Sequence, residues 1–421
     1  MDTYLPRILD GVLDAYLETF GAVYVRGPKW VGKTTTSLQK VKSVIKLQDP
    51  SAEDLISIGR VDFTNRILDG EYPRLIDEWQ LMPKIWDAVR VRVDDQSKNG
   101  MYILTGSAVP PKNEMRHSGA GRISRLTMYP MSLFETKESS GAISLSALFE
   151  NAHLQQVEDS PLTVEEIAFV LCRGGWPASI GKSEQNALLM GQEYITALAE
   201  SDLSKVTDSQ KAPQRVLSLL ASYARNISTM VENKTIIQDV QQSGISFAES
   251  TYHEYTNALR RLFVIEDIPA WSPAIRSKTT IRSKPKREFI DPSLAVASLG
   301  LNPNMLLDDL RYMGFLFETL CLRDLRVYSQ QLGGHLSHYH DRYGLECDCV
   351  LHLRDGRYAL IEFKLGGNLV DEGAAHLLQL KDLLSEHDLR LPSFLMVMTA
   401  GKFAYQRDDG VLVVPVATLA P

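Results

Sequence analysis

The chain has 421 residues, so we expect about two to four domains rather than one hydrophobic core. Its formal net charge of −7 argues against a protein coated in basic residues for nonspecific nucleic-acid binding, and no apolar run is long enough to cross a bilayer. The first residues lack the profile of a secretory signal, and the four cysteines show neither zinc-type pairs nor disulfide density, so we expect a cytoplasmic protein.

The first predicted elements surround a glycine-rich loop. Apolar residues 22–25 predict a strand, and a helix-compatible stretch begins at Thr34. Between them, the pattern G-x-x-x-x-G-K-T predicts a loop whose backbone N–H groups hold the phosphates of ATP. Lys33 would reach the β- and γ-phosphates, and the Thr34 hydroxyl would ligate Mg²⁺. The candidate nucleotide-binding residues of this segment are Gly27, Pro28, Lys29, Trp30, Val31, Gly32, Lys33, Thr34 and Thr35.

Two adjacent carboxylates follow a later buried strand. Residues 43–47 predict a second strand and residues 74–76 a third, which finishes in Asp77 and Glu78. A carboxylate at the end of a strand beside the phosphate loop can hold Mg²⁺, usually through water, and we assign this role to Asp77. Glu78 would orient or deprotonate the attacking water.

A further polar group follows the strand predicted at residues 101–105, which in a sheet of this type lies beside the strand of the phosphate loop. Thr105 and Ser107 are therefore candidates to sense the γ-phosphate or the lytic water, unless the strand simply ends in turn residues. Residues 116–125 then hold three arginines among glycines and serines. We choose Arg122 as the arginine that would neutralise transition-state charge across a subunit boundary in a homo-oligomer, with solvated loop arginines as the alternative.

Together these stretches resemble the AAA+ superfamily, and more narrowly the bacterial and archaeal AAA-type ATPases that carry a C-terminal domain similar to restriction endonucleases. The resemblance rests on the phosphate loop and on residues 75–78, 104–107, 121–122, 130–135 and 173–177. It implies an α/β core with a parallel sheet, followed by a helical lid. Lys29 and Trp30 depart from the residues expected inside the loop, at positions that the motif leaves variable.

The middle of the chain reads mostly as helix. Apolar residues recur at three- and four-residue intervals after about residue 144, and the resemblance makes residues 141–211 the helical lid. Residues 212–297 favour a winged helix, with a helix-turn-helix pattern around Gly244 and a wing hairpin near its end. The tip of that wing would be the basic stretch Arg276, Lys278, Arg282, Lys284, Lys286 and Arg287. Such a tip suits a DNA backbone, but it also suits a protein-binding winged helix with a soluble edge.

A carboxylate–lysine pattern marks the C-terminal part of the chain. Two predicted strands, around Asp348 and Glu362, are joined by a short loop that ends in Gly356. A three-residue loop with a left-handed Gly356 pairs Asp348 with Glu362 and Glu346 with Lys364, whereas a two-residue turn would scatter the carboxylates. We choose the three-residue loop because it gives the hairpin one apolar face and one polar face.

The polar face would bring these four charged side chains together, and Mg²⁺ is the cation expected there, because close carboxylates repel one another. Asp348 and Glu362-x-Lys364 match the motif of the PD-(D/E)xK nucleases residue by residue, and the segment resembles that fold. The resemblance implies that Asp348 and Glu362 hold the metal and that Lys364 orients the hydrolytic water. Glu318 matches the acid that this fold often carries upstream, and Gln379 and Lys381 would lie on the helix after the core strands. The alternative is a surface hairpin whose opposite charges pair.

A group of histidines and cysteines gives a weaker signal. His335, His338 and His340 lie near Cys347 and Cys349 in the sequence. Their spacing fits no familiar zinc pattern, and the hairpin register puts both cysteines on the apolar face. We therefore do not expect a zinc site there.

The sequence thus predicts an α/β protein with a P-loop ATPase core at 1–140, a helical lid at 141–211, a winged helix at 212–297 and a restriction-endonuclease-like domain at 298–421. ATP and Mg²⁺ are the expected cofactors, and no membrane partner is expected. Three function classes stay open: an ATP-gated nuclease that acts on DNA or RNA, a nucleotide-controlled module that binds nucleic acid without cutting it, and a switch that recruits another protein.

Overall fold

The computed structural model describes residues 4–49, 61–108, 118–154, 156–206, 212–272 and 284–421. The chain forms two compact units. The first unit comprises Met1–Tyr129, Asp202–Gln210 and Asn257–Phe263, and the second comprises Pro130–Ser201, Lys211–Thr256 and Val264–Pro421. Within the described ranges, no helix is both long and apolar enough to cross a membrane.

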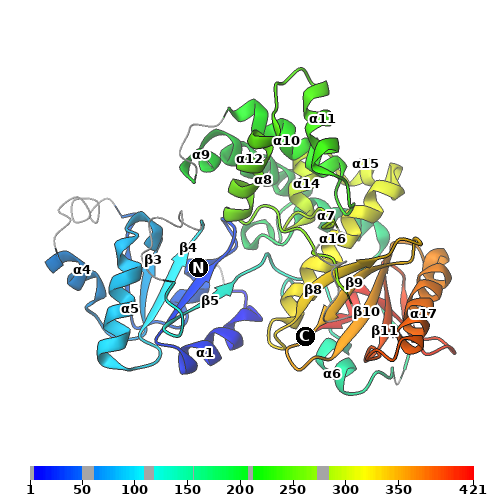
Figure 1. Ribbon diagram of the computed structural model, residues 1–421, viewed down its shortest axis with the longest axis horizontal. Coiled ribbons are helices and arrows are strands. Elements are labelled where there is room, and N and C mark those ends of the chain that lie inside the picture. The colour runs from blue at the N-terminus through cyan, green and yellow to red at the C-terminus, as the bar shows by residue number, and fades with distance from the viewer. Residues whose placement is uncertain (1–3, 50–60, 109–117, 155, 207–211, 273–283) are drawn as a thin grey trace. The chain divides into compact units, whose positions relative to one another are not determined.

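The first unit is built on a five-stranded parallel sheet with the order β2-β3-β4-β1-β5 (Figure 1). Its strands are β1 (Ala22–Arg26), β2 (Ser43–Lys46), β3 (Arg74–Asp77), β4 (Tyr102–Gly106) and β5 (Ile123–Thr127). The parallel sheet and the position of β4 beside β1 are confirmed. Strand β5 was not predicted, because its arginine suggested a loop. It forms because Ile123 and Leu126 are buried in the apolar layers of the unit, while Arg125 lies over the Trp86 ring.

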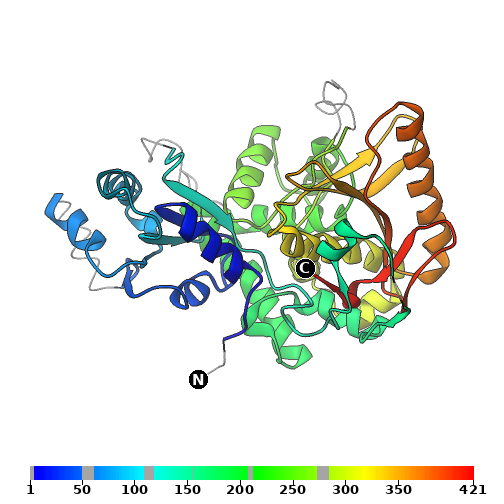
Figure 2. The ribbon, with the colours of Figure 1, turned by 90° about the horizontal axis from the view of Figure 1, so that it is seen from below.

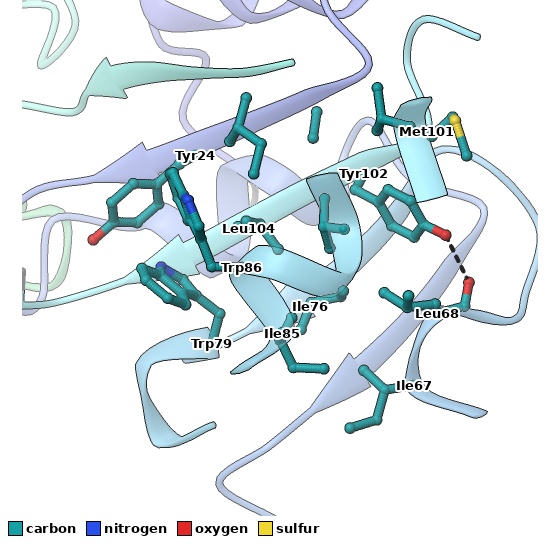
Figure 3. Packing of buried hydrophobic residues seen from close by; sticks show 14 of the residues in the cluster. Tyr24, Ile67, Leu68, Ile76, Trp79, Ile85, Trp86, Met101, Tyr102 and Leu104 are labelled. Carbon is teal, nitrogen blue, oxygen red and sulfur yellow. Dashed lines mark hydrogen bonds between the residues drawn. The ribbon is translucent and has the colours of Figure 1, made fainter. Parts of the chain in front are cut away.

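Both faces of this sheet carry an apolar layer, which explains why β1 and β4 are apolar almost throughout. Helix α1 (Leu9–Thr19) packs on one face, and Figure 2 shows it in dark blue along the sheet. Helix α5 (Lys84–Gln96) packs on the other face. On that side Tyr24 meets Trp79 edge to face, with ring centroids 5.4 Å apart, and Trp86 completes the cluster (Figure 3). The remaining helices of the unit are α2 (Lys33–Leu38), α4 (Val61–Leu68), η1 (Trp79–Leu81) and α9 (Leu203–Lys205).

The second unit contains a helical part, and in it both ends of α7 are set by its local sequence. Thr163 and Glu166 form a reciprocal capping box at the start of α7, and Gly174, at φ 72°, ends it where the glycine–proline stretch predicted a break. The helices of this part are α6 (Leu145–Glu150), α7 (Val164–Arg173), α8 (Glu184–Ala197), α10 (Pro213–Arg225), α11 (Asn233–Gln242), α14 (Pro292–Leu299), α15 (Pro303–Asp308) and α16 (Leu310–Ser329). Helix α12 (Glu249–Arg261) contributes residues to both units.

The predicted tip of the wing needs a correction. Antiparallel bridges join Ile265 to Phe289 and Ile268 to Lys286, as a hairpin requires, while Arg276, Lys278 and Arg282 lie outside the described residues. Of the other three basic residues, only Lys284 is exposed. Lys286 and Arg287 are buried because the bridge to Ile268 turns this segment into the unit, where both side chains pair with carboxylates.

A seven-stranded mixed sheet with the order β7-β12-β13-β11-β10-β9-β8 forms the rest of the second unit. Its strands are β7 (Glu158–Asp159), β8 (His335–His340), β9 (Glu346–His352), β10 (Tyr358–Lys364), β11 (Leu395–Thr399), β12 (Phe403–Gln406) and β13 (Leu412–Pro415). The β9–β10 hairpin has the register chosen from the sequence: Ile361 pairs with Cys349, and Gly356 has a φ of 84°. Continued by one residue, this register sets Asp348 opposite Glu362. A short parallel pair, β6 (Ile143–Ser144) with β14 (Leu419–Ala420), completes the unit.

The face of this hairpin that was expected to be polar is covered over part of its length. Helix α17 (Val370–Glu386) packs over the face that carries Val350 and Leu360, and Figure 1 shows α17 beside the strands β10 and β11. Helix α16 contacts β10 and β8 as well. The reason is tertiary: β10 lies in the interior of a seven-stranded sheet, so most of its length is buried, including Glu362.

A buried charge network joins distant parts of the second unit. The Arg323 guanidinium, on α16, donates to Asp324 at 2.9 Å and to Asp291 at 3.1 Å, and all three side chains are buried. The Gly175 N–H donates to Asp291, and the Leu133 N–H donates to Asp324. The stretches around residues 130–135 and 173–177, which carry part of the family resemblance, thus have a structural role in this unit.

We expect Arg323→Met to lower the free energy of unfolding by about 3–5 kcal/mol, because it leaves two buried carboxylates without their cation. Arg311→Met, at the exposed start of the same helix, should change it by less than about 0.5 kcal/mol. Urea denaturation of both variants, followed by circular dichroism, measures the difference. Equal stability of the two variants would contradict a structural role for Arg323.

Candidate functional site

The phosphate-binding loop connects β1 to α2 through residues that need unusual backbone angles. Gly27 has a φ of 149° and Gly32 a φ of 97°, and a Cβ on Gly27 would lie 2.2 Å from the Met128 carbonyl oxygen. Glycine at position 27 is therefore required by close approach as well as by conformation. Trp30 has a φ of 64° and is exposed, so the loop presents a large apolar side chain to solvent.

Lys33 is folded back on the loop that would hold the phosphates. Its buried ammonium donates to the carbonyl oxygens of Gly27 at 3.0 Å and of Pro28 at 2.7 Å. Burial lowers the pKa of Lys33 to about 8, although the carboxylates of Glu78 and Asp77 act in the opposite direction. A phosphate group in the loop would offer this ammonium a full negative charge in place of two carbonyl dipoles.

The Asp77 carboxylate contacts two other predicted residues. Its carboxylate lies at the end of β3, is fully buried, and accepts from the Thr34 hydroxyl at 2.7 Å and from the Thr105 hydroxyl at 2.5 Å. The ends of β3 and β4 and the start of α2 therefore meet at this carboxylate. Thr105 does more than end a strand, since its hydroxyl holds the Asp77 side chain in place.

Glu78 lies next to this group in a strained backbone conformation. Its φ is 55°, which is uncommon for a residue with a side chain and is typical of functional positions. The Glu78 carboxylate accepts from the Ser107 hydroxyl at 3.2 Å and from the Gln80 amide. Sequence reasoning missed Gln80. A Cβ on Gly106 would lie 2.4 Å from the Gln80 amide oxygen, so the pattern Gly106-Ser107 could have indicated a close neighbour at that point.

A second contact that the sequence did not indicate holds the loop. The Lys29 ammonium pairs with the buried Asp202 carboxylate at 2.5 Å, across 173 positions of the chain. Lys29 was named among the nucleotide-binding residues because it lies inside the motif. No local pattern connects it to Asp202, so only the fold shows that this lysine has a carboxylate partner.

Arg122 does not join the phosphate loop in its own chain. It immediately precedes β5, whose first residue pairs with Ala22 at the start of β1, whereas the loop follows the other end of β1. Five residues of strand separate the two ends by roughly 16 Å. The half-exposed Arg122 guanidinium pairs instead with Asp94 on α5 at 2.5 Å. Its role across a subunit boundary stays a prediction.

The C-terminal cluster contains three of the four predicted residues. The Lys364 ammonium lies 3.1 Å from the Glu362 carboxylate, and the Asp348 carboxylate accepts the Phe363 N–H at 3.0 Å. Burial raises the pKa of Glu362 well above its usual value, and the Asp348 charge adds to this shift. The fourth residue, Glu346, is the exposed first residue of β9 and has no contact with this group among the described interactions.

Two further residues belong to this cluster. The Lys286 ammonium lies 2.6 Å from the Glu318 carboxylate and 2.9 Å from the Asp348 carboxylate, and all three side chains are largely buried. Burial raises the pKa of Glu318 to about 8, against the attraction of Lys286. Glu318 was expected beside Asp348 from the resemblance. Lys286 was expected on a surface tip, and nothing in its local sequence indicates otherwise.

Neither a zinc site nor a three-carboxylate metal site is present in the described part of the chain. No group of three or more His, Cys, Asp or Glu side chains there is arranged to hold a metal ion. Cys347 and Cys349 are buried, and the His338 ring lies 3.0 Å from the Lys284 carbonyl oxygen. Gln379 and Lys381 lie on α17, as expected.

Comparisons with known families divide the chain into three parts. Residues 19–137 match a family described as an AAA domain. Residues 164–305 and 313–419 match two families described as domains of unknown function, DUF8612 and DUF4143. The last match gives no function, so it does not show a restriction-endonuclease-like domain.

The curated relatives of this chain are themselves uncharacterized, so they assign no function to it. The chain is 24% identical over 313 residues to the uncharacterized proteins Rv2008c of Mycobacterium tuberculosis and Mb2031c of Mycobacterium bovis, which covers 72% of this chain and 62% of theirs. Among solved structures, it is similar to the Walker-type ATPase PABY2304 of Pyrococcus abyssi, with 11% identity, a TM-score of 0.40, and coverage of 69% of this chain and 94% of that chain. The AAA match at residues 19–137 and the loop geometry are consistent with each other, since both place a nucleotide-binding fold in the N-terminal part of the chain.

Proposed function

We propose that this protein binds ATP with Mg²⁺, hydrolyses it, and uses the nucleotide state to control its second unit. One observation carries the first part: Lys33, Thr34 and Asp77 meet at the phosphate loop, and Glu78 directly follows Asp77 at the end of β3. The hydroxyl of Thr34 and the fully buried carboxylate of Asp77 are hard oxygen donors, which fits Mg²⁺. That ion would neutralise charge on the phosphates during phosphoryl transfer.

The residues of this chain would then have separate roles. Lys33 would leave the carbonyl oxygens of Gly27 and Pro28 and pair with the phosphates. Glu78, held by Ser107 and Gln80, would accept a proton from the attacking water or orient it. Thr105 would keep the Asp77 carboxylate aimed at the loop.

Phosphate release by the purified full-length chain tests this proposal. We expect turnover of ATP that requires Mg²⁺ and stops when EDTA removes it. Titration with a fluorescent ATP analogue separates binding from turnover. Absence of nucleotide binding in the presence of Mg²⁺ would refute the proposal as a whole, whereas binding without turnover would refute hydrolysis alone.

A second proposal concerns the other unit. The order α16, β8, β9, β10, α17, β11, with Asp348 and Glu362-x-Lys364 on the central hairpin, supports a nuclease-like fold at 298–421. The helices α10, α11 and α12, followed by antiparallel bridges, support a winged helix at 212–297. With the helical lid at 141–211 and the core at 1–140, these remain our proposed domains.

We propose that this nuclease-like part acts in binding rather than in cleavage, because Lys286 already neutralises its acids. The partner is then nucleic acid or another protein. Incubation of the full chain with ATP, Mn²⁺ and labelled DNA or RNA distinguishes the cases: salt-sensitive binding without cleavage supports a nucleic-acid module. Cleavage lost in Asp348→Ala would contradict this proposal and support an ATP-gated nuclease. Absence of any nucleic-acid affinity would favour a protein-recruiting switch.

A further inference from the structure

The acidic cluster of the second unit, formed by Glu318, Asp348 and Glu362, already contains a cation. The Lys286 ammonium lies between Glu318, on α16, and Asp348, on β9, at 2.6 Å and 2.9 Å. These are the distances of charge-assisted hydrogen bonds. Only 9% of the Lys286 side chain is exposed, so water cannot take over its contacts with the two carboxylates.

The backbone fixes this lysine in place. The Lys286 N–H donates to the Ile268 carbonyl at 2.9 Å, and the Ile268 N–H donates to the Lys286 carbonyl at the same distance. Its neighbour Arg287 is also buried and pairs with Asp267 at 3.2 Å. The backbone pair with Ile268 and the ion pair of Arg287 with Asp267 therefore fix the segment that places the Lys286 ammonium between the acids.

The carboxylate oxygens that a divalent ion would need are mostly engaged. One oxygen of Asp348 contacts Lys286, and the other accepts the Phe363 N–H. One oxygen of Glu362 contacts Lys364, while its second oxygen, Oε1, is buried and has no hydrogen-bond partner among the described residues. Mg²⁺ is usually bound by one or two carboxylates at about 2.0–2.1 Å together with water, and here each of the three carboxylates already has one oxygen against an ammonium group.

We propose that the Lys286 ammonium takes the position of a divalent cation in this cluster, so that the cluster binds neither Mg²⁺ nor Mn²⁺ while Lys286 is in place. The residues present thus do not fit the metal that a PD-(D/E)xK resemblance implies. Glu362 Oε1 is buried without a hydrogen-bond partner among the described residues, and we expect it to become a cation ligand once the lysine is removed. This inference is independent of ATP hydrolysis by the first unit.

Mn²⁺ binding by the nucleotide-free full chain, measured by electron paramagnetic resonance, tests the inference. All proteins carry Asp77→Asn and Glu78→Gln, so that neither carboxylate beside the phosphate loop can ligate Mn²⁺. With Lys286 present, we expect no Mn²⁺ binding that depends on Asp348, and Asp348→Asn should leave the titration unchanged. Lys286→Met should gain about one Mn²⁺ per chain with a Kd of about 1 mM or tighter, and adding Asp348→Asn should remove it.

Lys284→Met is the matched control, because this exposed lysine two residues earlier pairs with Glu232 and not with the cluster. It should gain no Mn²⁺. If Lys286→Met does not fold, Lys286→Met with Glu318→Gln keeps the net charge of the cluster and should still gain Mn²⁺ through Asp348 and Glu362. Asp348-dependent binding in the presence of Lys286, or no gain in a folded variant without Lys286, would overturn the inference.

Discussion

Replacing Lys33 with alanine is expected to lower ATP turnover by about 100-fold or more, because the variant loses the ammonium that we propose pairs with the phosphates. Among the described interactions, the Lys33 ammonium donates to the carbonyl oxygens of Gly27 and Pro28 and forms no ion pair. Its removal should therefore leave the fold intact. Phosphate release and titration with a fluorescent ATP analogue measure the two effects, and thermal unfolding checks the fold.

Lys40→Ala provides the control for this variant. Lys40 belongs to the same unit and pairs with the exposed Asp14 at 2.6 Å, away from the phosphate loop. Its loss removes the same charge from the domain without touching the site, so turnover should stay within about twofold of the wild type. Undiminished turnover in Lys33→Ala would show that the loop does not hold the phosphates in the proposed way.

Glu78→Gln is expected to separate binding from hydrolysis. Glutamine has nearly the same size and can still accept a hydrogen bond from Ser107, but it cannot take a proton from water. We expect ATP affinity close to the wild-type value and turnover lower by about 10²- to 10⁴-fold. Single-turnover phosphate release, measured with enzyme in excess over ATP, isolates the chemical step from product release.

Two outcomes would show that Glu78 is not the base. Wild-type turnover in Glu78→Gln would exclude it directly. Parallel losses of ATP affinity and turnover would indicate a structural role, which is conceivable because Glu78 has a φ of 55°. Glu71→Gln, an exposed glutamate before the same strand, should behave as the wild type and controls for the loss of one negative charge.

The position of Lys286 argues against the first of the three function classes, an ATP-gated nuclease. A nuclease-like cluster needs a divalent metal to activate water and stabilise a phosphorane-like transition state. Here an ammonium lies between the acids, and it belongs to a segment that is paired through its backbone. Metal-dependent cleavage would require Lys286 to leave the cluster, whereas a control function requires no such movement. The structure therefore favours our proposal that the second unit binds a partner rather than cleaves nucleic acid.

Much of this protein was readable from local sequence. The glycine positions of the phosphate loop, the strands before Asp77 and Thr105, and the register of the hairpin at Gly356 follow from backbone sterics and from side-chain alternation, which act over a few residues. The position of β4 next to β1 followed from the strand order expected for parallel sheets of this type. These predictions needed no knowledge of distant contacts.

Only the tertiary structure decided the electrostatic partners. Lys29 pairs with Asp202 across 173 positions, Lys286 with Asp348 across 62, and Arg122 with Asp94 at the edge opposite the phosphate loop. A charged side chain looks the same in sequence whether it meets water or a buried carboxylate, because its partner is set by which strands and helices pack together. For that reason the backbone conformation of the phosphate loop was predictable from its motif, whereas the cation of the C-terminal cluster was not.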